Sequence, residues 1–140
     1  MQTMWPVRES AVSISDGIEA RMIEAEAQLK AGNTAGALAT LNAARATVSG
    51  PAPLVDAGSD VARVNQLFRE RAFWFFSRGH RVGDLRRLIR QYGRTEAMVF
   101  PTGAWHKGGN YGTDVNFPIP QAEENNPNVP KGQSCIDRSA

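Results

Sequence analysis

The chain has 140 residues, of which 41% are hydrophobic and 21% charged, and its formal net charge is only +2. These values suit one globular domain with a real core and exclude a chain that is disordered throughout. No run of about 18 apolar residues occurs, so no helix is predicted to span a bilayer. The single cysteine, Cys135, excludes an internal disulfide and a cysteine-rich zinc site. It is either a buried bystander or the partner of a cysteine outside this chain.

Residues 16–50 have the pattern of two packed helices. Asp16 and Glu19 stand at the positions of a capping box, and apolar residues follow at helical spacing up to Gly32. Asn33 is a candidate cap for the next helix, and the short connection predicts an antiparallel hairpin. The stripe of that second helix consists of Ala37, Leu41, Ala44 and Val48. The stretch AEAQLKAGNTAGALATLNAAR resembles a tetratricopeptide repeat, and a generic helical hairpin explains it equally well.

Residues 60–93 predict a second, longer and more aromatic hairpin. Asp60 is a candidate cap for its first helix, Gly79 ends that helix, and Gly93 closes the following one. The stripe of the first helix consists of Val61, Val64, Phe68, Ala72 and Phe75, widened by Leu67 and Trp74.

The sequence from residue 94 onward has no helical period. It holds five of the eight prolines and five of the thirteen glycines, but also apolar anchors. The anchors are Val99, Phe100, Val115, Phe117 and Ile119. They indicate a segment that packs on the helices, where it could cover Phe73 and Phe76. The expected fold is therefore one mainly-α domain over 1–140, with two antiparallel tetratricopeptide-like hairpins and an irregular Pro/Gly/Asn-rich covering segment at 94–140.

Arginines are concentrated within residues 63–94, which hold nine of them and two acids. Such a surface could bind phosphate groups. No nucleic-acid motif accompanies it, however, and Asp84 stands three residues from both Arg81 and Arg87, where helical neighbours can pair. Structural pairing is the favoured interpretation, and no nucleic-acid partner is predicted.

A catalytic interpretation finds little support in the sequence. His80 and Asp84, four residues apart, could give an oriented imidazole. No nucleophile or second acid accompanies them, and His106 is the one other histidine. We therefore predict no catalytic residue, no metal site and no cofactor.

The stretch GHRVGDLRRLIRQYG resembles a signature near the end of RagB/SusD-family proteins. An aromatic-rich helix beginning Arg-Glu-Arg precedes it, as at residues 69–71, and FPIPQAEENNPNVP is similar to the closing segment of the family. The repeat-like helices stand upstream in the same order, so the resemblance covers residues 18–129. The matching positions are Gly79, His80, Arg81, Asp84, Leu85, Arg86 and Arg87, and then Pro118, Ile119, Pro120, Asn126 and Pro127.

The resemblance implies the C-terminal part of a SusD-like outer-membrane nutrient-binding lipoprotein, not an enzyme. Such proteins bind oligosaccharides or other nutrients as a lid on a SusC-type TonB-dependent transporter. They attach to the membrane surface through a lipid anchor. This chain lacks a lipoprotein signal and ends KGQSCIDRSA where the family has Gln-Asn-Pro-Gly-Tyr, so we expect a piece of a longer protein. The closing segment is expected to be structural, with a turn at residues 126–128.

The candidate ligand-binding residues lie in the glycine-rich stretch PTGAWHKGGNYGTDV. Trp105 and Tyr111 could stack on a sugar ring, with His106 and Asn110 as polar neighbours. Trp105 folding back onto the core is the alternative. The rival function is a small helical adaptor that binds a protein through its hairpin groove, and an enzyme ranks third.

Overall fold

The computed structural model describes residues 6–117, 123 and 126–128. Within these residues the protein is mainly helical and contains no named strand, which confirms the predicted fold class at this level. The helices are α1 (Gly17–Lys30), α2 (Thr34–Arg45), α3 (Asp60–Trp74), α4 (Arg81–Tyr92) and α5 (Glu96–Val99). The predictions for Pro118, Ile119, Pro120 and Cys135 lie outside the described residues. None of the helices described is long and apolar enough to cross a membrane.

Side-chain caps begin the first two helices, as predicted. The Glu19 amide donates to Asp16 Oδ1 at 2.9 Å, and the Gly36 amide donates to Asn33 Oδ1 at 2.9 Å. Between the helices Gly32 has φ +77°, a left-handed conformation that glycine adopts without strain. The connection is therefore short enough to turn the chain back on itself.

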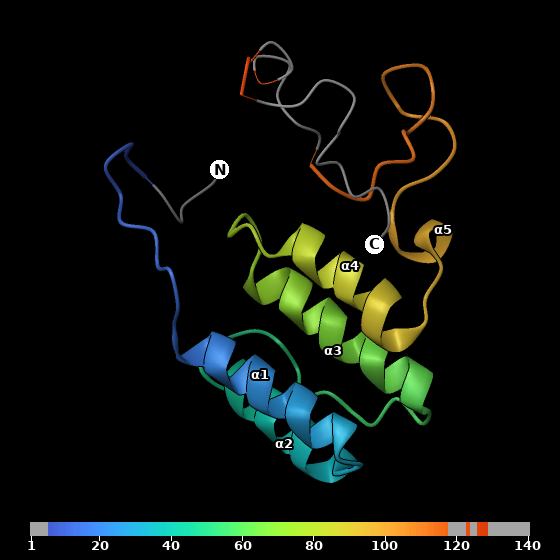
Figure 1. Cartoon of the computed structure of the whole chain (residues 1–140). Helices are drawn as coiled ribbons and strands as arrows, with labels where there is room; N and C mark the ends of the chain where they lie inside the picture. Colours follow the sequence, from blue (N-terminus) through green and yellow to red (C-terminus); the bar gives the residue numbers. More distant parts are fainter. Residues whose placement is uncertain (1–5, 118–122, 124–125, 129–140) are drawn as a thin grey trace. The chain divides into compact units, whose positions relative to one another are not determined.

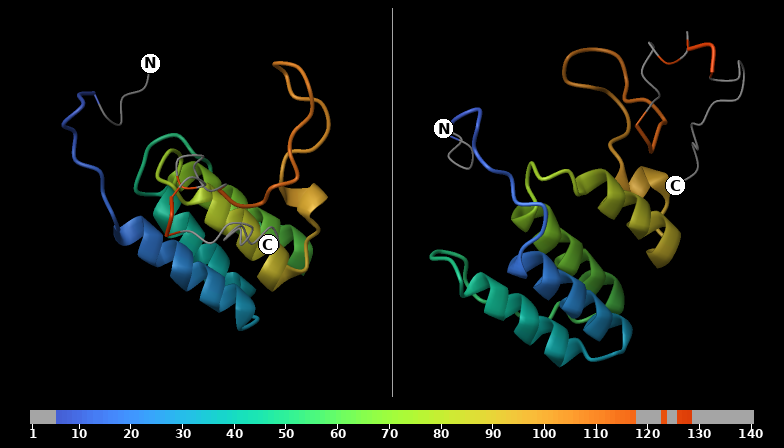
Figure 2. Two further views of the ribbon diagram at one scale, coloured as in Figure 1. Left: turned by 45° about the horizontal axis from the view of Figure 1, so that its top comes forward. Right: turned by 60° about the vertical axis from the view of Figure 1, so that its left-hand side comes forward.

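Small and flexible side chains form the contact between α1 and α2. Met22 and Ala25 of α1 are fully buried, as is Ala44 of α2. Figures 1 and 2 show the two helices side by side, and α1 also packs against α3. Alanine at these positions lets the two backbones approach closely. The predicted stripe ends earlier than expected, because α2 stops at Arg45 and Val48 beyond it is 46% exposed.

An irregular segment, residues 46–59, joins α2 to α3, and we call it the strap. Asn42 holds it at Leu54: the Leu54 amide donates to Asn42 Oδ1 at 2.7 Å, and Asn42 Nδ2 donates to the Leu54 carbonyl at 3.1 Å. Arg45 Nε donates to the Ala52 carbonyl at 2.8 Å, and Gln66 Nε2 donates to the carbonyl of residue 55 at 2.9 Å. These side chains supply the hydrogen bonds that a sheet partner would otherwise provide.

Helix α3 differs from the prediction at both ends. Ser59, not Asp60, accepts the first free amide, from Ala62 at 3.3 Å, because Asp60 is already the first helical residue. The helix stops at Trp74 instead of continuing to Gly79. Ser77 at φ +58° is left-handed, a conformation that ends a helix.

The predicted stripe of α3 is otherwise largely buried. Val64, Leu67 and Phe68 are at most 9% exposed. Val61, which we expected among them, is 56% exposed because it lies in the first turn. Phe75 is buried although it follows the end of the helix.

The chain divides into two compact units, residues 1–74 and 75–140, and each is described by itself. The first contains α1, α2, α3 and the strap. The second contains α4 and α5. The hairpin predicted over residues 60–93 spans the boundary between these units and stays a prediction.

Helix α4 ends as predicted and α5 was not expected. Gly93 closes α4 at φ +65°, and its amide donates to the Leu88 carbonyl. Leu85 and Leu88 are each 7% exposed. The prediction that no helix follows residue 94 was wrong, because α5 forms one turn there. One turn is too short for a helical period to be visible in the sequence.

Among its described residues, the covering segment after α5 has one well-buried anchor. Val115 is 2% exposed, whereas Phe117, expected to be a second anchor, is 77% exposed. At residues 126–128 the Asn128 amide donates to Asn126 Oδ1 at 3.0 Å, which gives the turn predicted there. Phe73 and Phe76, which need a covering surface, are 66% and 67% exposed.

Candidate functional site

The signature stretch, residues 79–87, surrounds the start of α4. Gly79 has φ +81°, and the His80 ring stacks on Phe75 with 4.4 Å between ring centroids. Asp84 is 4% exposed, and Arg87 donates to its Oδ1 at 3.3 Å. The signature thus lies in a packed turn and helix start, and the pairing predicted between Asp84 and Arg87 is present.

Carboxylates also bind arginines in the first unit. Arg63 holds Asp56 through two hydrogen bonds of 2.7 and 2.8 Å and contacts Asp60 at 2.9 Å. The bond from the Arg63 guanidinium lowers the pKa of Asp56 to about 2, and the same contact raises the pKa of Arg63. Arg45 meets Glu70 at 2.7 Å. The pairs of Arg63 agree with a structural role for the start of the arginine-rich sequence, and Arg45, which precedes that sequence, is paired in the same way.

The loop with the candidate ligand-binding residues is held by its own backbone. The Tyr111 amide donates to the Gly103 carbonyl, and the Trp105 amide donates to the Gly109 carbonyl, each at 2.9 Å. Ala104 and Asn110 form an isolated antiparallel bridge. Asn110 therefore stands in the neck of the loop, and its side chain is exposed to solvent.

Two of the predicted residues, Trp105 and His106, lie together at the tip of this loop, next to Lys107. Trp105 is 39% exposed, and the ring of His106 approaches its edge at 5.4 Å between centroids. Lys107 Nζ lies 5.7 Å from the centroid of the Trp105 ring, a cation–π distance. The indole is thus partly covered by its neighbours and partly open to solvent.

Tyr111 lies beside a hollow of about 570 Å³ in the second unit. Its walls come from α5 and from both sides of the loop. Six of the lining residues carry aromatic, hydroxyl or carboxylate groups: Glu96, Phe100, Thr102, Tyr111, Thr113 and Asp114. Of the four predicted ligand-binding residues, Tyr111 lines this hollow, while Trp105, His106 and Asn110 do not.

Sequence reasoning did not assign Glu96, Phe100, Thr102 or Thr113 to a site. Phe100 was considered only as an apolar anchor, and Glu96 stands in a helix that the sequence did not predict. A volume of about 570 Å³ falls within the range of small-molecule sites. The hollow offers an aromatic surface and two carboxylates that can accept hydrogen bonds from hydroxyl groups.

Among the described residues, no three histidine, cysteine, aspartate or glutamate side chains come together as metal ligands would. Comparison with protein-family models, with curated proteins and with solved structures gave no match to this chain.

Proposed function

We propose that this chain is the C-terminal part of a SusD-like outer-membrane nutrient-binding protein. The proposal is supported by the order of three sequence features: the repeat-like helices, the GHRVGDLRR signature and the FPIPQ closing segment. The mainly helical fold and the packed α1 and α2 agree with it. In this proposal the regions 16–50 and 60–93 are tetratricopeptide-like hairpins that act as scaffold.

The ligand in this proposal is an oligosaccharide, held in the hollow beside Tyr111. One observation carries it: an aromatic ring that is 40% exposed stands over a hollow that also contains Glu96 and Asp114. Pyranose rings stack on aromatic faces, and carboxylates accept hydrogen bonds from sugar hydroxyls. Trp105, at the tip of the same loop, could extend the stacking surface beyond the hollow.

Such a protein binds and does not catalyse. It would deliver its ligand to a SusC-type TonB-dependent transporter at the outer-membrane surface, where a lipid anchor would hold it. The test of the whole proposal therefore begins with binding, because binding does not require the transporter.

The decisive experiment is isothermal titration calorimetry of this chain with neutral glucose, xylose and mannose oligosaccharides. We expect one of these classes to bind and Tyr111→Ala to weaken its binding about tenfold, as removal of one stacking ring does. Trp105→Ala should weaken binding by a smaller factor. Phe76→Ala is the control, since Phe76 is an exposed ring in the same unit, at 67% against 40% for Tyr111, but lies outside the hollow. Absence of binding to every class, or equal affinity for Tyr111→Ala and Phe76→Ala, would overturn the proposal.

A further inference from the structure

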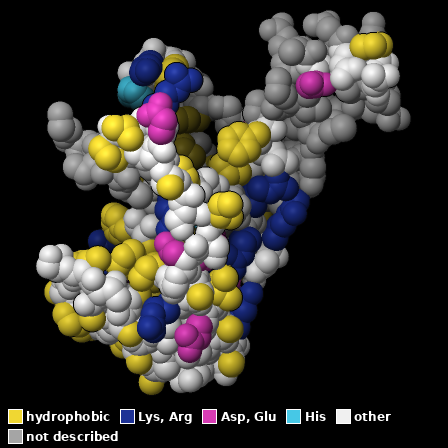
Figure 3. Space-filling view, turned by 90° about the vertical axis from the view of Figure 1, so that its left-hand side faces the viewer, with side chains coloured by type: hydrophobic (Ala, Val, Ile, Leu, Met, Phe, Trp, Pro, Cys, Tyr) yellow, Lys and Arg dark blue, Asp and Glu magenta, His cyan; other side chains and the backbone are white. Residues whose placement is uncertain are grey.

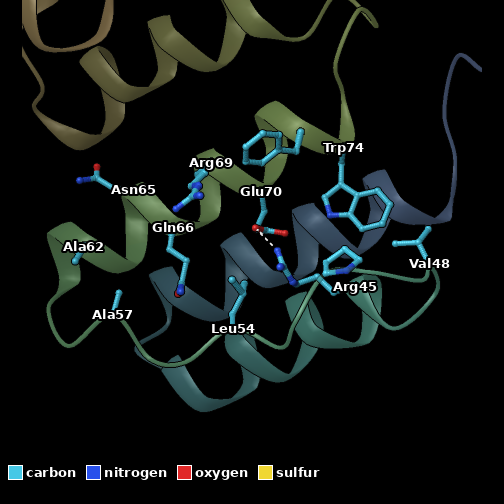
Figure 4. A pocket seen from close by; sticks show the side chains of 12 residues that line it. Arg45, Val48, Leu54, Ala57, Ala62, Asn65, Gln66, Arg69, Glu70 and Trp74 are labelled. Carbon is cyan, nitrogen blue, oxygen red and sulfur yellow. Dashed lines mark hydrogen bonds and ion pairs between the residues drawn. The ribbon is translucent and has the colours of Figure 1, made fainter. Parts of the chain in front are cut away.

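The first unit contains a groove of about 760 Å³, larger than the hollow beside Tyr111. One wall is the strap and the other is a face of α3, as Figure 4 shows. Every lining residue belongs to residues 45–74. The size lies within the range of sites that enclose a small organic molecule.

The strap presents every third residue to the groove. The strap residues that line it are Val48, Pro51, Leu54 and Ala57, all of them apolar. The backbone of this wall is fixed in place, because Asn42 holds both polar backbone groups of Leu54. The groove therefore has a continuous apolar wall that is already ordered before anything binds.

The α3 wall is aromatic at its C-terminal end. Phe73 and Trp74 line the groove there, and Phe73 is 66% exposed. On the other wall Val48 is 46% exposed. Covering such rings and aliphatic side chains removes apolar surface from water, which favours a ligand with an apolar body.

The Arg45–Glu70 ion pair lies between the walls. Glu70 is 3% exposed, and the guanidinium of Arg45 binds it at 2.7 Å while its Nε binds the strap at 2.8 Å. Figure 4 shows these two side chains pointing toward each other across the groove. The one carboxylate in the lining is thus neutralised by a cation that is held on two sides.

Arg69 adds a second positive charge to the lining. Its guanidinium lies 5.7 Å from the centroid of the Phe73 ring. It forms no ion pair with any other residue in the described part of the chain. A guanidinium at this distance from a ring still has its in-plane N–H donors, which match the two oxygens of a carboxylate. The lining carries Arg45, Arg69 and Glu70 as its charged residues, so its net charge is positive.

We propose that this groove binds a small monocarboxylate with an aliphatic or aromatic body. The carboxylate pairs with Arg69, and the apolar body lies along the strap, against Leu54 and Trp74. A neutral sugar would leave the apolar strap uncovered, and a cationic ligand would meet a positive lining. This site is independent of the one proposed for oligosaccharides, since it lies in the other unit and shares no residue with it.

The test compares 4-phenylbutyrate with 4-phenylbutanamide, which differ in charge but hardly in shape. Titration calorimetry of the whole chain should show the acid binding about fivefold to tenfold more tightly than the amide, the effect of one charge-assisted pair at an exposed rim. Arg69→Gln should remove that difference and leave the amide unaffected. Arg21→Gln, which removes an exposed arginine of α1 outside the groove, should preserve it.

A second variant separates the groove from other apolar surfaces. Ala62→Trp places a large ring in the lining at one end of the groove and should weaken binding of both compounds. Circular dichroism melting confirms that each variant is folded. The proposal would be overturned by equal affinities for acid and amide, or by a preference for the acid that survives Arg69→Gln. It would also be overturned if neither compound bound when present in about tenfold molar excess over about 1 mM protein. Tyr111→Ala should change none of these affinities, so this result and the oligosaccharide result can fail separately.

Discussion

Asn42→Ala tests whether one side chain fixes the strap. The variant removes two hydrogen bonds, of 2.7 and 3.1 Å, and leaves the half-buried amide and carbonyl of Leu54 without that partner. Each bond contributes about 1 kcal/mol net, and stranding partly buried groups adds a further fraction. Alanine regains roughly 0.5 kcal/mol of helix propensity within α2. The expected loss in the free energy of unfolding is therefore about 2 kcal/mol.

Urea unfolding followed by circular dichroism measures this loss. With a slope of about 2 kcal/mol per molar urea, the midpoint should fall by about 1 M. Ala43→Asn is the control, because it places an asparagine at the neighbouring exposed position of α2 and reports the propensity difference alone. A shift of the Asn42→Ala midpoint no larger than that of Ala43→Asn would show that the strap is held by other contacts.

Three further perturbations follow from single positions. Met22 is fully buried, so Met22→Ala should lower the free energy of unfolding, measured with urea, by about 2–5 kcal/mol. Ile23 is 58% exposed, so Ile23→Ala should lower it by less than about 1 kcal/mol, and equal losses would contradict the packing described. Gly93→Ala should lower the free energy of unfolding by about 1 kcal/mol, because residue 93 has a positive φ. Gly83→Ala should raise the free energy of unfolding, because residue 83 lies inside α4. The pKa of Asp56 is lowered to about 2, so its ion pair stabilises the fold above about pH 4 and is lost as pH falls toward 2. Asp56→Asn should flatten that part of the acid-unfolding profile, and an unchanged profile would count against the pair.

Local chemistry explains where the sequence predicted the fold well. Asp16, Asn33 and Gly93 act within a few residues of their own positions, as caps, and the structure confirms each of them. The predicted end of α3 was wrong, because Ser77 adopts a left-handed φ that could not be predicted from a serine at this position. The cap of α3 was misplaced by one residue, from Ser59 to Asp60, since both residues favour that position.

Apolar periodicity predicted burial well within helices and poorly at their ends. Met22, Leu41 and Phe68 lie in the middle of helices and are buried. Val48, beyond the end of α2, and Val61, in the first turn of α3, continue the same spacing, and both are exposed. In the view of Figure 3, hydrophobic side chains lie at the surface together with charged ones, as is usual for folded proteins.

The binding surfaces were less accessible to sequence reasoning. The sequence drew attention to Trp105 and Tyr111, because an exposed ring in a glycine-rich loop could stack on a sugar. It did not show that α5 brings Glu96 to the same hollow as Tyr111. The groove in the first unit depends on Arg45 meeting Glu70, 25 residues further along the chain, and no periodic pattern encodes such a contact.

Both hollows have irregular backbone that is fixed by hydrogen bonds and not by regular secondary structure. The strap is held by side chains from α2 and α3, and the loop around Trp105 is held by backbone bonds between its own two sides. Proline and glycine, which end helices, are also what permits extended and left-handed backbone at these places. A wall ordered in this way loses little conformational freedom when a ligand binds, so more of the contact energy appears as affinity. We therefore expect the irregular segments to preorganise both hollows, the strap through side chains of α2 and α3 and the loop through its own backbone, while the groups that contact a ligand come from helices as well as from these segments.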